Sequence, residues 1–309
     1  MSVERVRRAL TGISGVHVTP YDKSGSVDAV LLKKIVADMA AAGVHNIVSA
    51  GNTGEFFALT SDEVLRVHAA AIEGAAGRAL VTAAVGRSLN EAIATARAAR
   101  QAGADAVMAH HPLDPFAAPQ AQADYFIALA EASELPLVAY VRTDLIAAVD
   151  LARVATHPNV AGVKFATGNL MLLAECLRAT KGHPAAWICG LAEGWAAPFY
   201  ALGTRGFTSG LVNVDPKRSL AIWTALEAGD FPTARRLVDA IAPFEGLRTK
   251  FNNGANVTVV KEAMMLMGLA VGPVRLPGLS ALDNADRNRL RSLLSDWGLR
   301  PLSIPGAAE

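Results

Sequence analysis

One lysine of this 309-residue chain lies where a charged side chain is costly. Lys164 falls inside the apolar run Val160–Ala166, whereas the other lysines lie in predicted helices, turns or tails. A salt-bridged lysine, a side chain that reaches solvent and a functional amine are the three interpretations. Burial lowers the pKa of an amine, so a neutral Lys164 could attack the ketone of a 2-oxo acid. The resulting iminium stabilises a carbanion, which permits aldol cleavage, aldol addition or elimination of water.

A tyrosine and a glycine-rich turn could complete such a site. Tyr140 lies in the apolar run Pro136–Val141, and alternation along the strand turns it inward, as it does Lys164 on the next strand. Its phenol could move protons, although a tyrosine that only fills the interior has the same pattern. The segment Gly51–Glu55 (Gly-Asn-Thr-Gly-Glu) could direct backbone N–H groups and the Thr53 hydroxyl at a carboxylate, although many tight turns share it.

Metal and disulfide chemistry find no support in the sequence pattern. His110 and His111 are consecutive strand residues whose side chains point to opposite faces, so they cannot ligate one ion together. We predict packed or solvated histidines, no metal, and no cofactor beyond the covalent Schiff base. Cys176 and Cys189 have neither a disulfide-framework nor a metal-ligand spacing, so a reduced cytoplasmic compartment is expected.

Short apolar runs alternate with Ala- and Leu-rich helical patterns through most of the chain. The predicted strands are Ile13–Tyr21, His45–Gly51, Ala79–Gly86, Ala106–Pro112, Pro136–Val141, Val160–Ala166, Ala185–Gly190 and Gly206–Asn213. The predicted helices lie near Val27–Ala42, Ser61–Ala76, Leu89–Ala102, Pro119–Ser133, Asp150–His157, Asn169–Lys181, Glu193–Leu202 and Pro216–Ala228. Eight such units predict a (β/α)8 TIM barrel with its active site at the carboxyl ends of the strands. An open doubly wound sheet would need Gly-x-Gly-x-x-Gly after the first strand, and that motif is missing.

Local signals support this division and mark where the barrel ends. A glycine follows three of the helical patterns, at Gly43, Gly103 and Gly203. Thr60 and Glu63 have the spacing of a capping box. After Gly229 the pattern becomes helical, with candidates at Pro232–Arg248, Val257–Met267 and Asp286–Trp297. We therefore predict a barrel over residues 1–229 that carries the active site, and a three-helix extension over residues 230–309 packed on it.

The composition argues against several classes of partner. The chain has 29 basic and 28 acidic residues and no basic block, which argues against nucleic-acid binding. No stretch approaches the ~20 apolar residues that a membrane span needs. The charged N-terminus is followed by no apolar run, so a signal peptide is not expected. The expected partner is a small molecule.

Taken in order, these motifs resemble the dihydrodipicolinate synthase/N-acetylneuraminate lyase family. That family has Gly-x-Thr-Gly-Glu after strand two, a strand-five Tyr and Gly-x-Lys in strand six. This chain matches them with Gly51–Glu55, Tyr140 and Gly162–Lys164, and further matches are Val18–Asp22, Ala102–Ala106 and Asn213–Pro216. The resemblance implies the barrel, a Schiff base on Lys164, Tyr140 as proton shuttle and carboxylate binding at Asn52 and Thr53. It also implies a 2-oxo acid such as pyruvate as substrate, and a homo-oligomer (tetramer or dimer).

Several positions depart from the pattern of the dihydrodipicolinate synthases within that family. Those enzymes carry a second Thr where this chain has Asn52, and a tyrosine pair where it has Leu113 and Asp114. They also follow the strand-five Tyr with Asn-x-Pro and an Arg, whereas this chain continues with Val141 and Arg142. We therefore expect a weakened proton relay and the loss of the arginine contact to the carboxylate of the second substrate.

Other details resemble 5-dehydro-4-deoxyglucarate dehydratases of the same family. These are Gly54–Thr60, the position of Arg142, and Ala270–Arg275 in the tail. We therefore predict dehydration of a deoxy-keto sugar acid, with dihydrodipicolinate synthase, a pyruvate-dependent aldolase and a non-catalytic 2-oxo-acid-binding barrel as alternatives. The substrate-binding candidates are Gly51, Asn52, Thr53, Arg142, Gly190 and Ser209.

Overall fold

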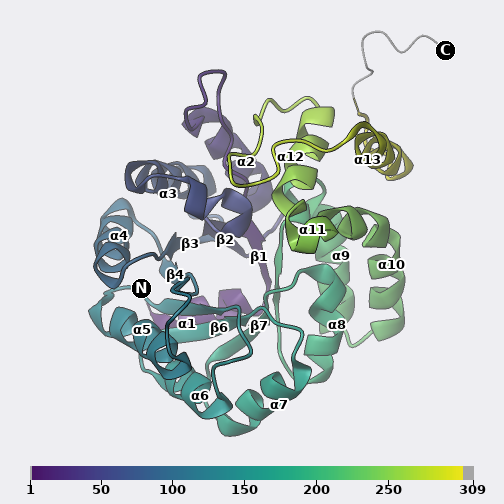
Figure 1. The fold of residues 1–309 in the computed structure, drawn as a ribbon. Helices are drawn as coiled ribbons and strands as arrows, with labels where there is room; N and C mark the ends of the chain where they lie inside the picture. The colour runs from purple at the N-terminus through teal and green to yellow at the C-terminus, as the bar shows by residue number, and fades with distance from the viewer. Residues whose placement is uncertain (1, 302–309) are drawn as a thin grey trace, which may run out of the picture.

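The computed structural model describes residues 2–301, which form an eight-stranded parallel barrel surrounded by helices (Figure 1). The strands pair in chain order, and β1 closes the ring by pairing with β8. They are β1 Ile13–Val16, β2 Asn46–Ser49, β3 Leu80–Val85, β4 Ala106–Ala109, β5 Leu137–Val141, β6 Val160–Phe165, β7 Ala186–Cys189 and β8 Phe207–Ser209. Every strand residue except Ala186 is buried, because helices cover the outside and side chains fill the inside. The predicted barrel is confirmed.

A helix follows each strand and covers the outside of the barrel. These helices are α2 Ala29–Ala41, α3 Ser61–Ala75, α4 Leu89–Ala102, α5 Pro119–Ala132, α6 Ala148–Thr156, α7 Leu170–Ala179, α8 Glu193–Ala201 and α9 Pro216–Glu227. Thr60 begins α3 with the predicted capping box, in which Thr60 and Glu63 each accept from the other's backbone N–H. Gly103 ends α4 at φ 100°, a left-handed conformation that glycine adopts without strain. Among the described residues, no helix combines the length and apolarity that crossing a membrane requires.

All eight strands are shorter than predicted, and the first and eighth differ most because the chain turns at their carboxyl ends. The first predicted strand, Ile13–Tyr21, stops at Val16, and the eighth stops at Ser209 before the 3-10 turn Leu211–Asn213. The Asn213 side chain accepts from the Val18 N–H at 3.0 Å and donates to the Val16 carbonyl at 2.9 Å. A side chain thus satisfies backbone groups that a longer ladder would have paired.

Helix α1, Val3–Leu10, was not predicted. It packs against the starts of the strands, with Val6 and Leu10 buried. Its signals were present but short: Ser2 accepts from the Arg5 N–H as N-cap, and the last turn is basic. Val3, Val6 and Leu10 have the i, i+3, i+7 spacing of an amphipathic helix, so this helix could have been predicted from the sequence.

The C-terminal extension packs on the barrel through the contacts of α10 with α8 and α9. It comprises the three expected helices and a short fourth, as α10 Phe231–Arg248, α11 Lys250–Asn253, α12 Asn256–Leu266 and α13 Asn284–Asp296. Within α11, Phe251 and Asn252 have φ values of 55° and 53°, so the chain turns sharply there. This turn separates α10 from α12.

A buried ion pair joins the extension to the loop after β2. Lys261 Nζ of α12 lies 2.6 Å from Glu55 Oε1, and the side chains are 1% and 4% exposed. Lys261 also donates to the Pro273 carbonyl at 3.1 Å, and Glu55 Oε2 accepts from the Arg275 N–H at 2.8 Å. Each Glu55 oxygen therefore has a partner in a site that excludes solvent.

Replacing Lys261 by methionine is expected to lower the free energy of unfolding by about 3–5 kcal/mol, because the Glu55 carboxylate would stay buried without its cation. Lys34→Met is the matched control, since Lys34 pairs with Asp38 on the surface with side chains 62% and 66% exposed. Breaking an exposed pair costs about 0–1 kcal/mol. Urea unfolding measures both losses, and equal losses would show that burial adds nothing to the Lys261–Glu55 pair.

Candidate active site

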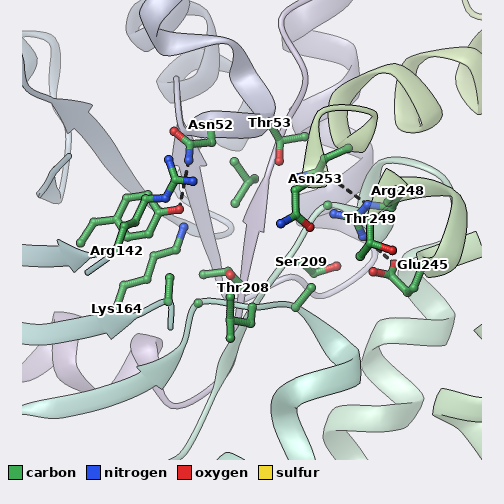
Figure 2. A pocket seen from close by; sticks show the side chains of 18 residues that line it. Asn52, Thr53, Arg142, Lys164, Thr208, Ser209, Glu245, Arg248, Thr249 and Asn253 are labelled. Atoms are coloured by element: carbon green, nitrogen blue, oxygen red, sulfur yellow. Dashed lines mark hydrogen bonds and ion pairs between the residues drawn. The ribbon is translucent and has the colours of Figure 1, made fainter. Parts of the chain in front are cut away.

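A cavity lies at the carboxyl ends of the strands, where the active sites of such barrels are found. Its volume is about 190 Å³, below the roughly 300–1,000 Å³ of pockets for drug-sized ligands, so it suits a small acid. Strand-end residues line one side and residues of the C-terminal extension line the other (Figure 2). Among the predicted site residues, those that line the cavity are Asn52, Thr53, Tyr140, Arg142, Lys164, Gly190 and Ser209.

Lys164 and Tyr140 are paired neighbours on β6 and β5. Lys164 Nζ lies 3.9 Å from the centroid of the Tyr140 ring, and the lysine is only 4% exposed. Unlike Lys261, it has no carboxylate partner among residues 2–301. Burial, with a smaller contribution from the Arg142 charge, lowers the pKa of Lys164 to about 7, and Cys189 opposes that shift. Near pH 7 much of the amine is therefore neutral, the form that attacks a ketone.

The hydroxyl of Tyr140 is held by a side chain from the β2 loop. It accepts a hydrogen bond from the Asn52 amide at 3.0 Å. Burial raises the pKa of Tyr140, whereas the Arg142 charge and the Asn52 hydrogen bond oppose the rise. The phenol therefore keeps its proton at neutral pH, and Asn52 fixes the orientation of this proton donor.

The glycine-rich segment after β2 forms a 3-10 turn over Asn52–Gly54. Thr53 is 5% exposed and lines the cavity, and Glu55 follows in a left-handed conformation at φ 62°. Gly51 was expected to bind substrate, but it is not among the lining residues. A Cβ at Gly51 would lie 2.6 Å from Val16 Cγ1, so glycine here serves the packing of two neighbouring strands.

Arg142 and Ser209, two other expected substrate ligands, differ in whether their polar groups already have a partner in the protein. The side chain of Arg142 is exposed at the cavity, with its guanidinium carbon 6.0 Å from the Tyr140 ring centroid. The hydroxyl of Ser209 donates to the buried Glu193 carboxylate and also contacts the Ser219 hydroxyl. Arg142 is therefore free to meet an anion, whereas the proton of Ser209 is committed to Glu193.

Gly190, at the exit of β7, contributes backbone to the cavity wall. Its N–H donates to the Phe165 carbonyl at 2.8 Å, so that donor is not available to a ligand. A Cβ at Gly190 would lie 2.6 Å from the Ala166 Cβ, so a larger residue would displace the end of β6. Glycine here keeps the strand that carries Lys164 in position.

The histidine pair and Asp114 lie outside this cavity. His110 stacks on Phe56 with ring centroids 4.3 Å apart, and burial lowers its pKa to about 3, which leaves the ring neutral. The His111 ring instead lies 6.3 Å from that of Phe126 in α5, as strand alternation predicts. Asp114 accepts from a backbone N–H and lines a separate cavity.

The extension supplies lining residues that were not predicted. They are Glu245 and Arg248 of α10, followed by Thr249, Asn253 and Asn256. Arg248 is 5% exposed, the most deeply buried arginine of the cavity wall. The polar run Asn252–Asn256 between two helices was the available signal, but its place over the barrel depends on the turn at α11.

Comparison with known proteins agrees with this geometry. The model of the Dihydrodipicolinate synthetase family matches residues 9–297. A 4-hydroxy-tetrahydrodipicolinate synthase of Methanoculleus marisnigri is 34% identical, over 93% of this chain and 99% of the relative. A probable 5-dehydro-4-deoxyglucarate dehydratase of Methylobacterium radiotolerans is 31% identical, over 95% of this chain and 97% of the relative.

A solved structure shows the same fold at similar identity. The crystal structure of dihydrodipicolinate synthase from Bacillus clausii superposes with a TM-score of 0.92 at 39% sequence identity. The superposition covers 95% of this chain and 100% of that one. The chain therefore belongs to the dihydrodipicolinate synthase family of class I, Schiff-base-forming lyases.

Proposed function

We propose that this chain binds pyruvate as a Schiff base on Lys164 and condenses it with an aldehyde that carries a carboxylate, such as aspartate semialdehyde. The observation that carries the proposal is the buried Lys164 amine, which has no ion-pair partner and lies 3.9 Å from the Tyr140 ring in a cavity at the strand ends. A homo-oligomer is part of the proposal, and sedimentation velocity would measure it.

The first half of the reaction forms the iminium. The neutral Lys164 amine attacks C2 of pyruvate, which makes the C–N bond, and a proton passes from the nitrogen to the carbonyl oxygen, which becomes a hydroxyl. Tyr140 donates a proton to that hydroxyl, which leaves as water and gives the iminium. Thr53 and the backbone of its turn would hold the carboxylate beside C2.

The second half uses the iminium as an electron sink. The Tyr140 phenolate left by the first half takes a proton from C3, which gives an enamine, and C3 then attacks the aldehyde carbon. The new C–C bond forms while Tyr140 returns that proton to the aldehyde oxygen. Water then gives a proton to the Tyr140 phenolate and adds to C2, and the C–N bond breaks to release the product and the neutral Lys164 amine. Arg142, exposed at the cavity, would attract the anionic aldehyde toward it by its charge.

The choice of reaction departs from the dehydratase predicted from motif details. Synthase names are more frequent than dehydratase names among the curated relatives, which favours the synthase alternative. The dehydratase stays as a second candidate because of one observation. Leu113 and Asp114, which stand where synthases carry a tyrosine pair, line a different cavity and contribute nothing to a proton relay at Lys164.

Steady-state assays of both reactions on one preparation test the proposal. We expect turnover of pyruvate with aspartate semialdehyde, and none in Lys164→Ala. Turnover of 5-dehydro-4-deoxyglucarate without any condensation would favour the second candidate instead. If the protein formed the trapped Schiff base but turned over neither substrate set, it would be a 2-oxo-acid-binding protein, and the proposed catalysis would be refuted.

A further inference from the structure

We propose that Arg248 binds the substrate carboxylate that lies farthest from the ketone, an inference that rests on the Schiff base proposed above. Arg248 ends α10, and only 5% of it is exposed. It lines the same cavity as Lys164, and Figure 2 shows the two residues on opposite sides. The cavity thus has a covalent anchor on one side and a cation on the other.

Two hydrogen bonds hold the guanidinium of Arg248 in a fixed plane. Nε donates to Asn256 Oδ1 at 2.8 Å, and Nη1 donates to Glu245 Oε1 at 2.6 Å. A guanidinium has five N–H groups, so three remain, including both on Nη2. Within residues 2–301, Nη2 makes no hydrogen bond. The guanidinium is therefore oriented by the protein but keeps donors for a ligand.

The neighbouring strand end leaves room for these donors. Arg248 Nη2 lies against Gly210, directly after β8, and a Cβ at that glycine would be 2.7 Å from Nη2. Any larger residue at 210 would push the guanidinium away from the cavity wall. Glu245 balances the buried positive charge yet occupies only one N–H.

A carboxylate is the group that best fits this arrangement. The planar fork of an arginine matches a carboxylate with two parallel hydrogen bonds, which are strong when solvent is excluded. Arg142 also lines the cavity, but its side chain is exposed, so water and salt screen its charge. We therefore assign the distal carboxylate to Arg248, which makes the preferred substrates 2-oxo acids or adducts that carry a second carboxylate.

Borohydride trapping with matched acids tests the assignment. 2-Oxoadipate and 2-oxohexanoate have equal chain length and differ in the distal carboxylate. Arg248→Gln should raise the half-saturating concentration of 2-oxoadipate by about 10- to 100-fold, the effect of losing hydrogen bonds to a charged group. The values for 2-oxohexanoate and pyruvate should change little. Arg248→Lys should fall between, because it keeps the charge without the fork.

Arg235→Gln is the control, because Arg235 lies on the same helix with its side chain 84% exposed. Half-saturating concentrations do not depend on the amount of folded protein, so lost stability cannot mimic the result. The Arg248 assignment would be overturned if Arg248→Gln weakened the binding of all three acids equally. It would also be overturned if Arg142→Gln, but not Arg248→Gln, weakened the binding of 2-oxoadipate selectively. Either result would leave the Schiff base on Lys164 standing. If the unaltered protein formed no adduct with any acid, the Schiff base itself would be refuted, and the inference with it.

Discussion

Lys164→Ala is expected to abolish both the borohydride-trapped adduct with pyruvate and all turnover, while the barrel stays folded. Lys164 is the one lysine among the residues that line the cavity within residues 2–301, so no neighbouring amine can replace it. The alanine also removes a buried polar group without an ion-pair partner, which offsets part of the lost packing. Peptide mass spectrometry after trapping should find one reduced adduct, on the peptide that contains Lys164.

The pH dependence of trapping gives the same amine a second signature. Because burial lowers the pKa of Lys164 to about 7, the neutral fraction falls about tenfold per pH unit below that value. The trapping rate should therefore rise with pH to about 7 and then level off. For a lysine with an ordinary pKa, the trapping rate would continue to rise up to about pH 10. Lys34→Ala, at an exposed site, should leave this profile unchanged. An adduct that persists in Lys164→Ala, for example on the buried Lys261, would contradict the assignment.

The barrel and the Lys164–Tyr140 pair could be predicted because both follow from short-range patterns. Alternation of strand and helix defines the (β/α)8 order, and parity along two consecutive strands places both side chains inside. The structure pairs these residues directly across β5 and β6. The turn at Asn52 and Thr53 was predictable for the same reason, since it directly follows β2.

The other side of the cavity could not be predicted, because it depends on long-range packing. Arg248 reaches the cavity through the contacts of α10 with α8 and α9, and the sharp turn at Phe251 and Asn252 brings its partner Asn256 back beside it. Neither feature has a periodic signal. For Ser209 the position at the cavity was predicted correctly, but its hydrogen bond was not. Its hydroxyl donates to the buried Glu193, which lies 16 residues away in the sequence.

Tyr140→Phe is expected to lower the turnover rate by about 10²–10⁴-fold, the usual contribution of a positioned proton donor. The phenol adjoins the Lys164 amine, and burial keeps it protonated, so phenylalanine removes the proton while it preserves the ring. The Asn52 amide would lose its acceptor, which costs only about 0.5–1.5 kcal/mol of stability. Stopped-flow measurement should show slower Schiff-base formation, together with a small shift of the unfolding midpoint.

Tyr125→Phe provides the matched control for this prediction. Tyr125 is partly buried, and its hydroxyl donates to the Arg87 carbonyl, but it lines the cavity that contains Asp114. Tyr125→Phe should remove one hydrogen bond, as Tyr140→Phe does. Its turnover rate should stay within about twofold of that of the unaltered protein, because no reacting atom lies near Tyr125. If both variants kept near-normal turnover, Tyr140 would only fill the barrel interior, and the proton would have to come from water or from the substrate. If both lost activity equally, the effect would be structural.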